Sequence, residues 1–302
     1  MPLPLLLDCD PGHDDALALL LALASPEVEL LGVTTVHGNQ TLEKTTANAL
    51  RVLELAGRAD VPVAAGAARP LSREPFVAAY VHGESGLDGP ALPAPTARAV
   101  DEPAVDFLAE RVGRGVTLVA TGPLTNVALL LDRGVVPERI VLMGGSIGLG
   151  NVTPAAEFNI WVDPEAAARV FASGTDVTMV GLDVTHQALL GPERANRLRT
   201  AGRIGSVVAE LLDFYGRYHH EQYGWDGSPI HDAVALAYAF RPGLLETLER
   251  HVAVEVESEL CRGRTVVDLW RRTDSAPNAR IATGIDSDGF LDLLCERLAS
   301  LG

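Results

Sequence analysis

The sequence predicts an α/β protein with an open, mostly parallel β-sheet and helices on both faces. Short apolar runs typical of buried strands alternate with alanine- and leucine-rich amphipathic stretches typical of helices. Hydrophobic residues make up 47% of the chain and aromatic residues only 5%, which favours this class over an aromatic-rich β-sandwich. We expect residues 1–302 to form a single domain, since a chain of this length can bury one large core.

The expected elements follow in a regular order. Strands are predicted at 3–8, 29–36, 61–65, 116–120, 139–143, 176–182 and 252–256, with a late edge strand at 265–269. Helices are predicted at 14–24, 42–56, 103–113, 124–132 and 164–173. Lid-like loops are predicted at about 69–100, which is rich in proline and glycine, and at about 216–230.

The charge and the apolar pattern exclude several functions. A formal net charge of −16 without any basic run argues against binding to nucleic acid. No apolar stretch is long enough to span a bilayer, so no membrane association is expected. The N-terminus lacks an export signal, and the three cysteines form neither a metal motif nor a disulfide framework. We therefore expect a cytoplasmic location.

Four aspartates crowd into the segment after the first predicted strand: Asp8, Asp10, Asp14 and Asp15. Carboxylates this close repel one another unless a counter-charge is present, and a hard divalent cation is the natural partner. Favourable interaction with a helix N-terminus, at ~0.3–1 kcal/mol per group, is too weak to explain all four.

The spacing of the four aspartates suggests different roles. Asp8 and Asp10 share one face of a strand, whereas Asp14 and Asp15 point about 100° apart around a helix and should not aim at one point. A metal could bind Asp10 and Asp15, which leaves Asp14 for a substrate hydroxyl. Asp8 lies one pleat earlier and is expected to contact the metal-binding residues without binding the metal itself.

Further polar residues follow other predicted strands. Asn39 follows the second, residues 121–126 the fourth and Met143 the fifth. Ligands of open parallel sheets bind beyond the carboxyl ends of the strands, so these segments should meet in one crevice. The turn at residues 121–126 could hold an anion but lacks the lysine of a phosphate-binding loop.

Two segments in the second half carry further candidate residues. Asp232 opens an apolar helix and is either an N-cap or an additional carboxylate ligand, with His231 beside it. If residues 157–159 are extended, Glu157 and Asn159 face the same side and suit sugar hydroxyls. Asp163, which precedes a proline and a glutamate, is expected to be a structural helix cap.

Residues 8–16 resemble the signature of the inosine–uridine nucleoside hydrolase family. The resemblance covers nearly the whole chain, with the further segments in the family's order: 38–41, 81–90, 122–126, 143–145, 151–159 and 231–232. It implies a Rossmann-like, Ca²⁺-dependent N-ribohydrolase that cleaves ribonucleosides to ribose and free nucleobase in nucleoside salvage or catabolism. It also implies a homotetramer or homodimer.

The resemblance also implies the roles of individual residues. Ca²⁺ would be bound by Asp10, Asp15, Asp232 and the backbone carbonyl of Thr125. Ribose would be bound by a second set, with Met143 nearby: Asp14, Asn39, Asn151, Glu157 and Asn159. His231 would face the nucleobase, and His82 would lie on a mobile flap above it. The catalytic group would comprise Asp10, Asn39 and His231.

The chemistry of these side chains agrees with the assigned roles. Three carboxylates and a carbonyl leave room for water and a vicinal diol around an ion that takes ~6–8 oxygens. Asp10 could take a proton from cation-polarised water, which attacks C1′ through an oxocarbenium-like transition state. The departing base needs a hydrogen-bond or proton donor, and His231 has an ordinary pKa suited to that role. A lid residue is the alternative donor.

The nucleobase is harder to predict. Histidine at position 231 resembles the inosine–uridine group rather than the purine-specific group, which has tryptophan there. Cys9 and His13 resemble the bacterial pyrimidine-preferring members, so uridine and cytidine are the first expectation and inosine is a further one. Tyr223 and Trp225 could stack on the base or simply pack the lid.

The acidic motif is compatible with two other functional classes. Metal-dependent phosphoryl transfer also uses an Asp-x-Asp after a first strand, but no basic phosphate clamp lies near the motif. A Ca²⁺-dependent nucleoside-binding protein would bind uridine without turnover.

Overall fold

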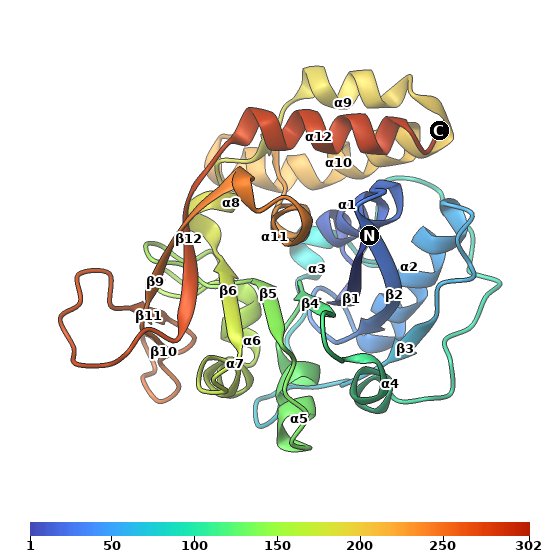
Figure 1. Ribbon diagram of the computed structural model, residues 1–302. Coiled ribbons are helices and arrows are strands. Elements are labelled where there is room, and N and C mark those ends of the chain that lie inside the picture. The colour runs from blue at the N-terminus through green and yellow to red at the C-terminus, as the bar shows by residue number, and fades with distance from the viewer.

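A central eight-stranded sheet organises the computed structural model, which describes residues 1–302 (Figure 1). The strand order is β3-β2-β1-β4-β5-β6-β12-β9, and every neighbouring pair is parallel except β12 and β9. The strands are β1 Leu3–Cys9, β2 Val28–Thr35, β3 Val63–Ala65, β4 Thr117–Ala120, β5 Arg139–Met143, β6 Asp176–Val180, β9 Leu245–Arg250 and β12 Ala279–Ile285. The predicted fold class is confirmed.

Helices cover both faces of the sheet in separate layers (Figure 1). One side carries α1 His13–Ala24, α2 Leu42–Leu55 and α11 Asp232–Phe240, with α9 Pro192–Arg199, α10 Gly202–Tyr223 and α12 Ser287–Ala299 outside them. The other side carries α4 Ala104–Arg111, α5 Thr125–Asp132, α6 Phe158–Val162 and α7 Pro164–Phe171. Three short helices complete the set: α3 Ala79–His82, α8 Leu182–Thr185 and the 3-10 turn Pro242–Leu244.

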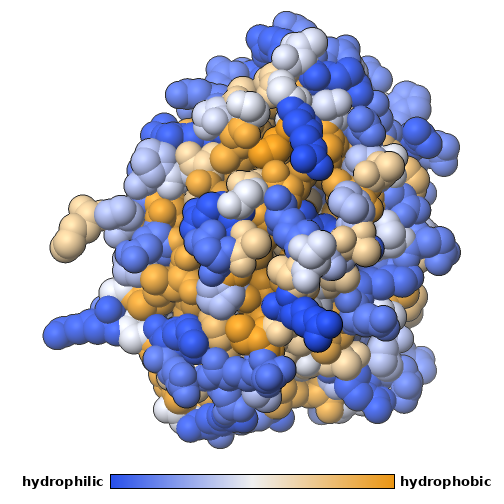
Figure 2. Space-filling view, turned by 90° about the vertical axis from the view of Figure 1, so that its right-hand side faces the viewer, coloured by the Kyte–Doolittle hydropathy of each residue, from blue (hydrophilic) through white to orange (hydrophobic).

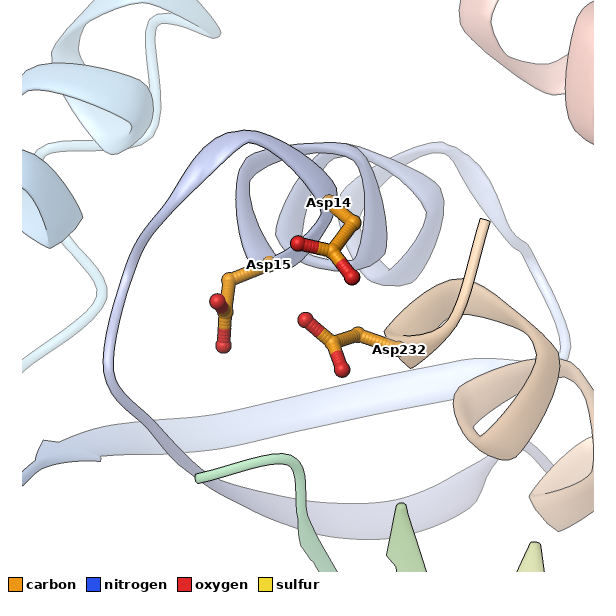
Figure 3. Close-up of side chains that lie close together, drawn as sticks. All are labelled: Asp14, Asp15 and Asp232. Carbon is orange, nitrogen blue, oxygen red and sulfur yellow. The ribbon is translucent and has the colours of Figure 1, made fainter. Parts of the chain in front are cut away.

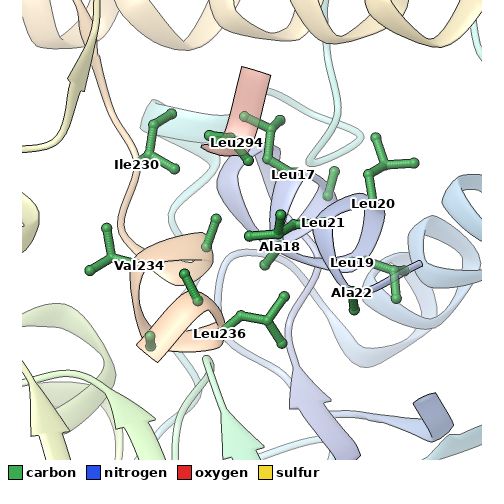
Figure 4. Close-up of a cluster of buried hydrophobic side chains, with 14 of the residues drawn as sticks. Leu17, Ala18, Leu19, Leu20, Leu21, Ala22, Ile230, Val234, Leu236 and Leu294 are labelled. Atoms are coloured by element: carbon green, nitrogen blue, oxygen red, sulfur yellow. The ribbon is translucent and has the colours of Figure 1, made fainter. Parts of the chain in front are cut away.

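Helix α1 is buried on all sides, which fits its composition of leucine and alanine. Its apolar side chains lie between α11 and the outer helices, as Leu17, Leu21, Val234, Leu236 and Leu294 show in Figure 4. Packing of this kind fixes the axis of α1, and therefore also the direction in which its polar first turn points.

The last strands of the sheet differ from the prediction. Residues Val252–Val254 (β10) and Thr265–Val267 (β11) pair with each other outside the main sheet, whereas the prediction placed 252–256 within it and 265–269 at its edge. The sheet is instead completed by β12 and by β9, whose sequence includes two glutamates and an arginine. A second small pair joins β7 Leu189–Leu190 to β8 Ser228–Pro229.

The two predicted loops have different outcomes. Residues 69–100 are irregular except for α3, as expected. The loop predicted at about 216–230 is wrong in its first half, because α10 continues to Tyr223 and ends at Gly224 in the left-handed conformation (φ 71°). Gly216 lies inside the helix because it packs closely against Ser228, where an added Cβ would come within 3.0 Å of the hydroxyl oxygen.

The order of the strands locates a crevice. The chain runs outward from β1 to β2 and β3, then returns to add β4 on the other side of β1. Ligands of such sheets bind at this reversal, beyond the carboxyl ends of the two flanking strands. The segment after β1 holds Asp10, and the segment after β4 holds Thr121.

The molecular surface is mixed in polarity. On the face seen in Figure 2, polar side chains surround a central band of apolar ones. No helix combines the length and the apolar character needed to cross a membrane.

Candidate active site

Three carboxylates converge at the crevice (Figure 3). Asp14 and Asp15 come from the first turn of α1, and Asp232 comes from the first residue of α11. One oxygen from each lies within 4.8 Å of the others, and all three residues are buried. The expectation that Asp14 and Asp15 cannot aim at one point is therefore wrong. Asp232 approaches from the facing helix α11, so the side chains of Asp14 and Asp15 each need to turn only partly toward Asp232.

Asp15 is held by four hydrogen bonds. Its Oδ1 accepts from the backbone N–H of Asp10 at 3.3 Å and from the hydroxyl of Thr121 at 2.9 Å. Its Oδ2 accepts from the N–H of Gly12 and from the amide Nδ2 of Asn39, both at 3.0 Å. These donors fix the carboxylate in one orientation at the start of α1.

Asp10 is fully buried and only half satisfied. Its Oδ2 accepts from the backbone N–H of Asn39 at 2.6 Å, whereas Oδ1 has no hydrogen-bond partner. A Cβ at Gly38 would lie 2.0 Å from Oδ2, and one at Gly122 would lie 2.6 Å from Oδ1. Both glycines are therefore required sterically, since any side chain would displace the Asp10 carboxylate.

The buried carboxylates of this cluster repel one another, and a bound cation would offset that repulsion. Burial, and next the charge of Asp15, raise the pKa of Asp14 to about 8. The pKa values of Asp10 and Asp232 are raised well above the ordinary range, first by burial and then by neighbouring carboxylates. Burial also raises the pKa of Asp15 despite its hydrogen bonds. No lysine or arginine lines the adjoining pocket, so the all-oxygen donor set fits a hard divalent ion.

The predicted role of the Thr125 backbone carbonyl in binding a cation stays a prediction. The Thr125 hydroxyl donates to Asp163 Oδ2 at 2.7 Å, and the residue does not line the pocket. Thr121, at the carboxyl end of β4, lines the pocket and bonds to Asp15. Both threonines belong to the turn between β4 and α5.

All eight residues predicted to bind substrate line one pocket above the carboxylates. They are Asp14, Asn39, His82, Met143, Asn151, Glu157, Asn159 and His231. They come from separate strand ends, the 69–100 loop and α11, so the fold gathers them from most of the chain. Asp10, Asp15 and Asp232 lie behind this lining.

Helix α6 presents the carboxylate and amides of the pocket wall. Residues 157–159 are not extended as predicted, because Glu157 caps α6 by accepting from the N–H groups of Asn159 and Ile160. Asn159 Nδ2 donates to the carbonyl of Thr121 at 2.7 Å, and Asn151 Oδ1 accepts from the N–H of Phe158 at 2.9 Å. Burial raises the pKa of Glu157 to about 7.

The predicted structural role of Asp163 is confirmed. Its Oδ1 accepts from the N–H of Ala166 in the first turn of α7, at 3.1 Å. Its Oδ2 accepts from the N–H of Leu71 and from the hydroxyl of Thr125. The residue joins the start of the 69–100 loop to α5 and α7 and lies outside the pocket lining.

The pocket lining also carries imidazoles and phenol rings. His231 Nδ1 lies 2.8 Å from the Thr185 hydroxyl, and its ring packs edge-on against His186 at 5.6 Å. Burial lowers the pKa of His231 and of His82 well below the ordinary value, so both are neutral at pH 7. The expectation that His231 has an ordinary pKa is therefore wrong.

Several lining residues escaped prediction. His186, His219, Tyr215, Tyr218 and Tyr80 all border the pocket. Three of them belong to α10, whose helical continuation was not foreseen, so their spacing of three to four residues was the signal that could have placed them on one face. Tyr223 also lines the pocket, whereas Trp225 stacks on Tyr223 at 4.5 Å without lining it.

A parallel sheet with a buried acidic cluster under a polar and aromatic pocket defines an α/β enzyme acting on a small molecule. The family model of the inosine-uridine preferring nucleoside hydrolases matches residues 5–292, and the chain belongs to this family. It is accordingly a hydrolase acting on N-glycosyl compounds.

Named relatives agree with this family. The pyrimidine-specific ribonucleoside hydrolase RihA of Shigella boydii serotype 4 is 53% identical over 99% of both chains. A solved purine-preferring ribonucleoside hydrolase from Gardnerella vaginalis is 37% identical, with a TM-score of 0.93 over 99% of this chain and 98% of that one. A plant nucleoside hydrolase, PpNRh1, is 34% identical, with a TM-score of 0.92 over 99% of this chain and 100% of that one.

A divalent cation should stabilise the protein, and more so at higher pH. The pKa of Asp14 is raised from 3.8 to about 8 in the fold, so the folded state binds more protons than the unfolded state across that window and loses stability as pH rises. We expect saturating Ca²⁺ to raise Tm over an EDTA-treated sample by roughly 5 °C at pH 8 and by less at pH 6.

Thermal melting of two variants tests the location of this effect. Asp15→Asn should abolish the Ca²⁺-dependent increase in Tm. Asp163→Asn, a change at a buried carboxylate outside the cluster, should lower Tm but retain the increase. An equal response to Ca²⁺ in both variants would contradict a cation site at the cluster.

Proposed function

We propose that the protein hydrolyses the N-glycosidic bond of pyrimidine ribonucleosides, with uridine and cytidine as first substrates and inosine as a weaker one. The products are ribose and the free nucleobase. One observation carries the proposal: a single pocket joins a buried carboxylate cluster to amide, carboxylate and imidazole side chains spaced along it. The first end suits a sugar diol, and the second suits a heteroaromatic ring.

The proposed cation is Ca²⁺, with Asp15 and Asp232 of the cluster as carboxylate ligands together with the neighbouring Asp10, whose Oδ1 has no hydrogen-bond partner. The backbone carbonyl of Thr125 is the proposed neutral oxygen donor, and the bond of its hydroxyl to Asp163 holds this residue at the start of α5. When bound, the ion would supply Lewis acidity that favours deprotonation of water and would attract the vicinal hydroxyls of ribose.

The side chains around the substrate have different proposed roles. Asp10 accepts a proton from the attacking water through Oδ1, the oxygen that has no protein partner. Asp14 and Glu157 accept hydrogen bonds from sugar hydroxyls, while Asn39 and Asn159 present amides to the same ring. The nearby negative charges also stabilise the positive charge that develops on the ribose in an oxocarbenium-like transition state.

His231 acts on the leaving nucleobase. Because its pKa is lowered, the neutral ring is the form present at pH 7, and it acts as a hydrogen-bond donor through Nε2 while Nδ1 is engaged by Thr185. A neutral donor stabilises a departing anion without carrying a charge into a buried site. His82 covers the same end of the pocket from the 69–100 loop.

The pyrimidine preference is supported by two observations. The relative from Shigella boydii, named as pyrimidine-specific, is 53% identical, whereas the structure named as purine-preferring is 37% identical. The phenol and imidazole rings of Tyr215, Tyr218, His186 and His219 also crowd the base end of the pocket. A single-ring base requires less space there than a purine.

We also propose a homo-oligomer, tetramer or dimer, in the cytoplasm. Trp270 and Leu260 are 79% and 85% exposed, and large apolar side chains of this kind often mark subunit contacts. Three cysteines without disulfides fit a reducing compartment.

Ribonucleosides should be strongly preferred over 2′-deoxyribonucleosides. The acceptors around Asp14 and the proposed cation both require the 2′-hydroxyl, and buried polar groups left unpaired are costly. We expect kcat/KM for 2′-deoxyuridine to be roughly 10²–10⁴-fold below that for uridine. A reducing-sugar assay over a nucleoside panel, with and without EDTA, measures this; similar rates for both sugars would refute the proposed ribose contacts.

The Asp10→Asn variant should lose turnover while remaining folded. The amide preserves the shape between Gly38 and Gly122 but removes the proton acceptor, and we expect kcat for uridine to fall roughly 10²–10⁴-fold. Asp8→Asn is the matched control, since Asp8 is equally buried but bonds to Thr34 and Asn126 behind the site. Near-normal kcat in Asp10→Asn would remove Asp10 as the base.

The contribution of His231 should depend on the leaving group. His231→Ala should lower kcat/KM for uridine roughly 10²–10⁴-fold, because the uracil anion needs a donor as it departs. The same change should scarcely affect 4-nitrophenyl riboside, whose leaving phenolate is stable unaided. Equal losses on both substrates would assign His231 to positioning of the ribose instead.

A further inference from the structure

His13 of the first motif has no role in the proposed function. It is the first residue of α1, adjacent to Asp14, and is 1% exposed. It does not line the pocket. A buried histidine is unusual enough to require an explanation from its contacts.

Both ring nitrogens of His13 contact the loop that closes the pocket, residues 69–100, hereafter the flap. Its Nε2 donates to the backbone carbonyl of Asp88 at 2.8 Å, which leaves Nδ1 unprotonated. This Nδ1 lies 3.1 Å from Nδ1 of His82, which donates to it in one tautomer and in the other accepts from the backbone N–H of His13 at 3.2 Å. One residue of α1 therefore makes three contacts with the flap.

Stacking supplies a second set of contacts. The His13 ring lies nearly parallel to the rings of Phe214 and Tyr215 of α10, with centroids 5.3 and 5.4 Å away. It also stacks on His82 at 5.3 Å. The histidine thus joins the three elements that surround the base end of the pocket: the helix with the acidic residues, the flap and α10.

The contacts determine how His82 meets a ligand. The backbone N–H and the Nδ1 of His13 both approach Nδ1 of His82, so Nε2 is the nitrogen of the His82 ring left for a molecule in the pocket. Gly12 allows this arrangement, because a Cβ there would lie 2.6 Å from His82 Nδ1. The His82 ring is therefore held against the backbone at the start of α1.

We propose that His13 is a positioning residue that holds His82 and the flap over the nucleobase, and so sets the affinity for the base without touching it. The inference rests on the proposed nucleoside hydrolase function. Its consequence is that the flap is bonded directly to the first turn of α1, which carries Asp14 and Asp15. The sugar end and the base end of the pocket are then held by the same helix.

A double-mutant cycle tests this role. We expect His13→Leu to lower kcat/KM for uridine roughly 10–100-fold, mainly through KM, because the flap residue is misplaced. The same change made in His82→Ala should cost less than about 3-fold, since His13 acts through His82. Inhibition by free ribose, which has no base, should be unchanged in all variants. Additive losses across the cycle would overturn the proposal.

A pair of conservative variants separates positioning from packing and remains available if His13→Leu does not fold. His13→Asn places an amide near the former Nδ1, within reach of His82, whereas His13→Gln places one near the former Nε2, toward Asp88. We expect Asn to retain the lower KM for uridine. Equal KM values in both variants at equal Tm would assign His13 to packing and overturn the proposal.

Two further measurements serve as the control and the reference for these variants. Phe214→Leu removes a stacking partner of His13 but no hydrogen bond to the flap, so it should lower Tm with little change in KM. Wild-type turnover of uridine is the reference. Its absence would refute the proposed function, whereas wild-type turnover with an additive cycle would refute only the role of His13.

Discussion

The burial of several carboxylates without a basic partner is the constraint on which the rest of the site depends. Asp10, Asp14, Asp15 and Asp232 are each at most 5% exposed. Isolated buried charges cost several kcal/mol each, and the helix N-termini beneath Asp15 and Asp232 offset only a small part of that cost. Such a cluster persists in a folded protein because it serves a positively charged species, here the proposed cation and the developing charge on the sugar.

The fold meets this constraint through rigid surroundings. Helix α1 is packed on all sides, so its first turn cannot move the acidic residues apart to relieve their repulsion. Glycines at 38 and 122 let the backbone close around Asp10, and the amide and N–H of Asn39 bind both Asp10 and Asp15. The repulsion is thus held in place by packing elsewhere, as at other preorganised sites.

Much of this arrangement could be predicted from the sequence, because its signals are local. Apolar runs predicted the first six strands of the sheet, and the motifs predicted eight residues that line the pocket. The failures concern tertiary context. The convergence of Asp14 with Asp15 depends on Asp232, which lies in a helix distant in the sequence. Likewise, the sequence of β9 is that of a charged surface segment, and only its pairing with β12 places it in the sheet.

The electrostatic division of the pocket favours an uncharged substrate. At one end lie buried carboxylates, and at the other lie imidazoles whose pKa values are lowered, so that no group in the lining carries a positive charge at pH 7. A phosphate on the sugar would meet Asp14 and Glu157 without any arginine or lysine to balance it. A nucleoside brings only hydroxyls and a neutral ring, which the acceptors and neutral donors of the lining can satisfy completely. The absence of a basic clamp therefore disfavours both nucleotides as substrates and phosphoryl transfer as the reaction.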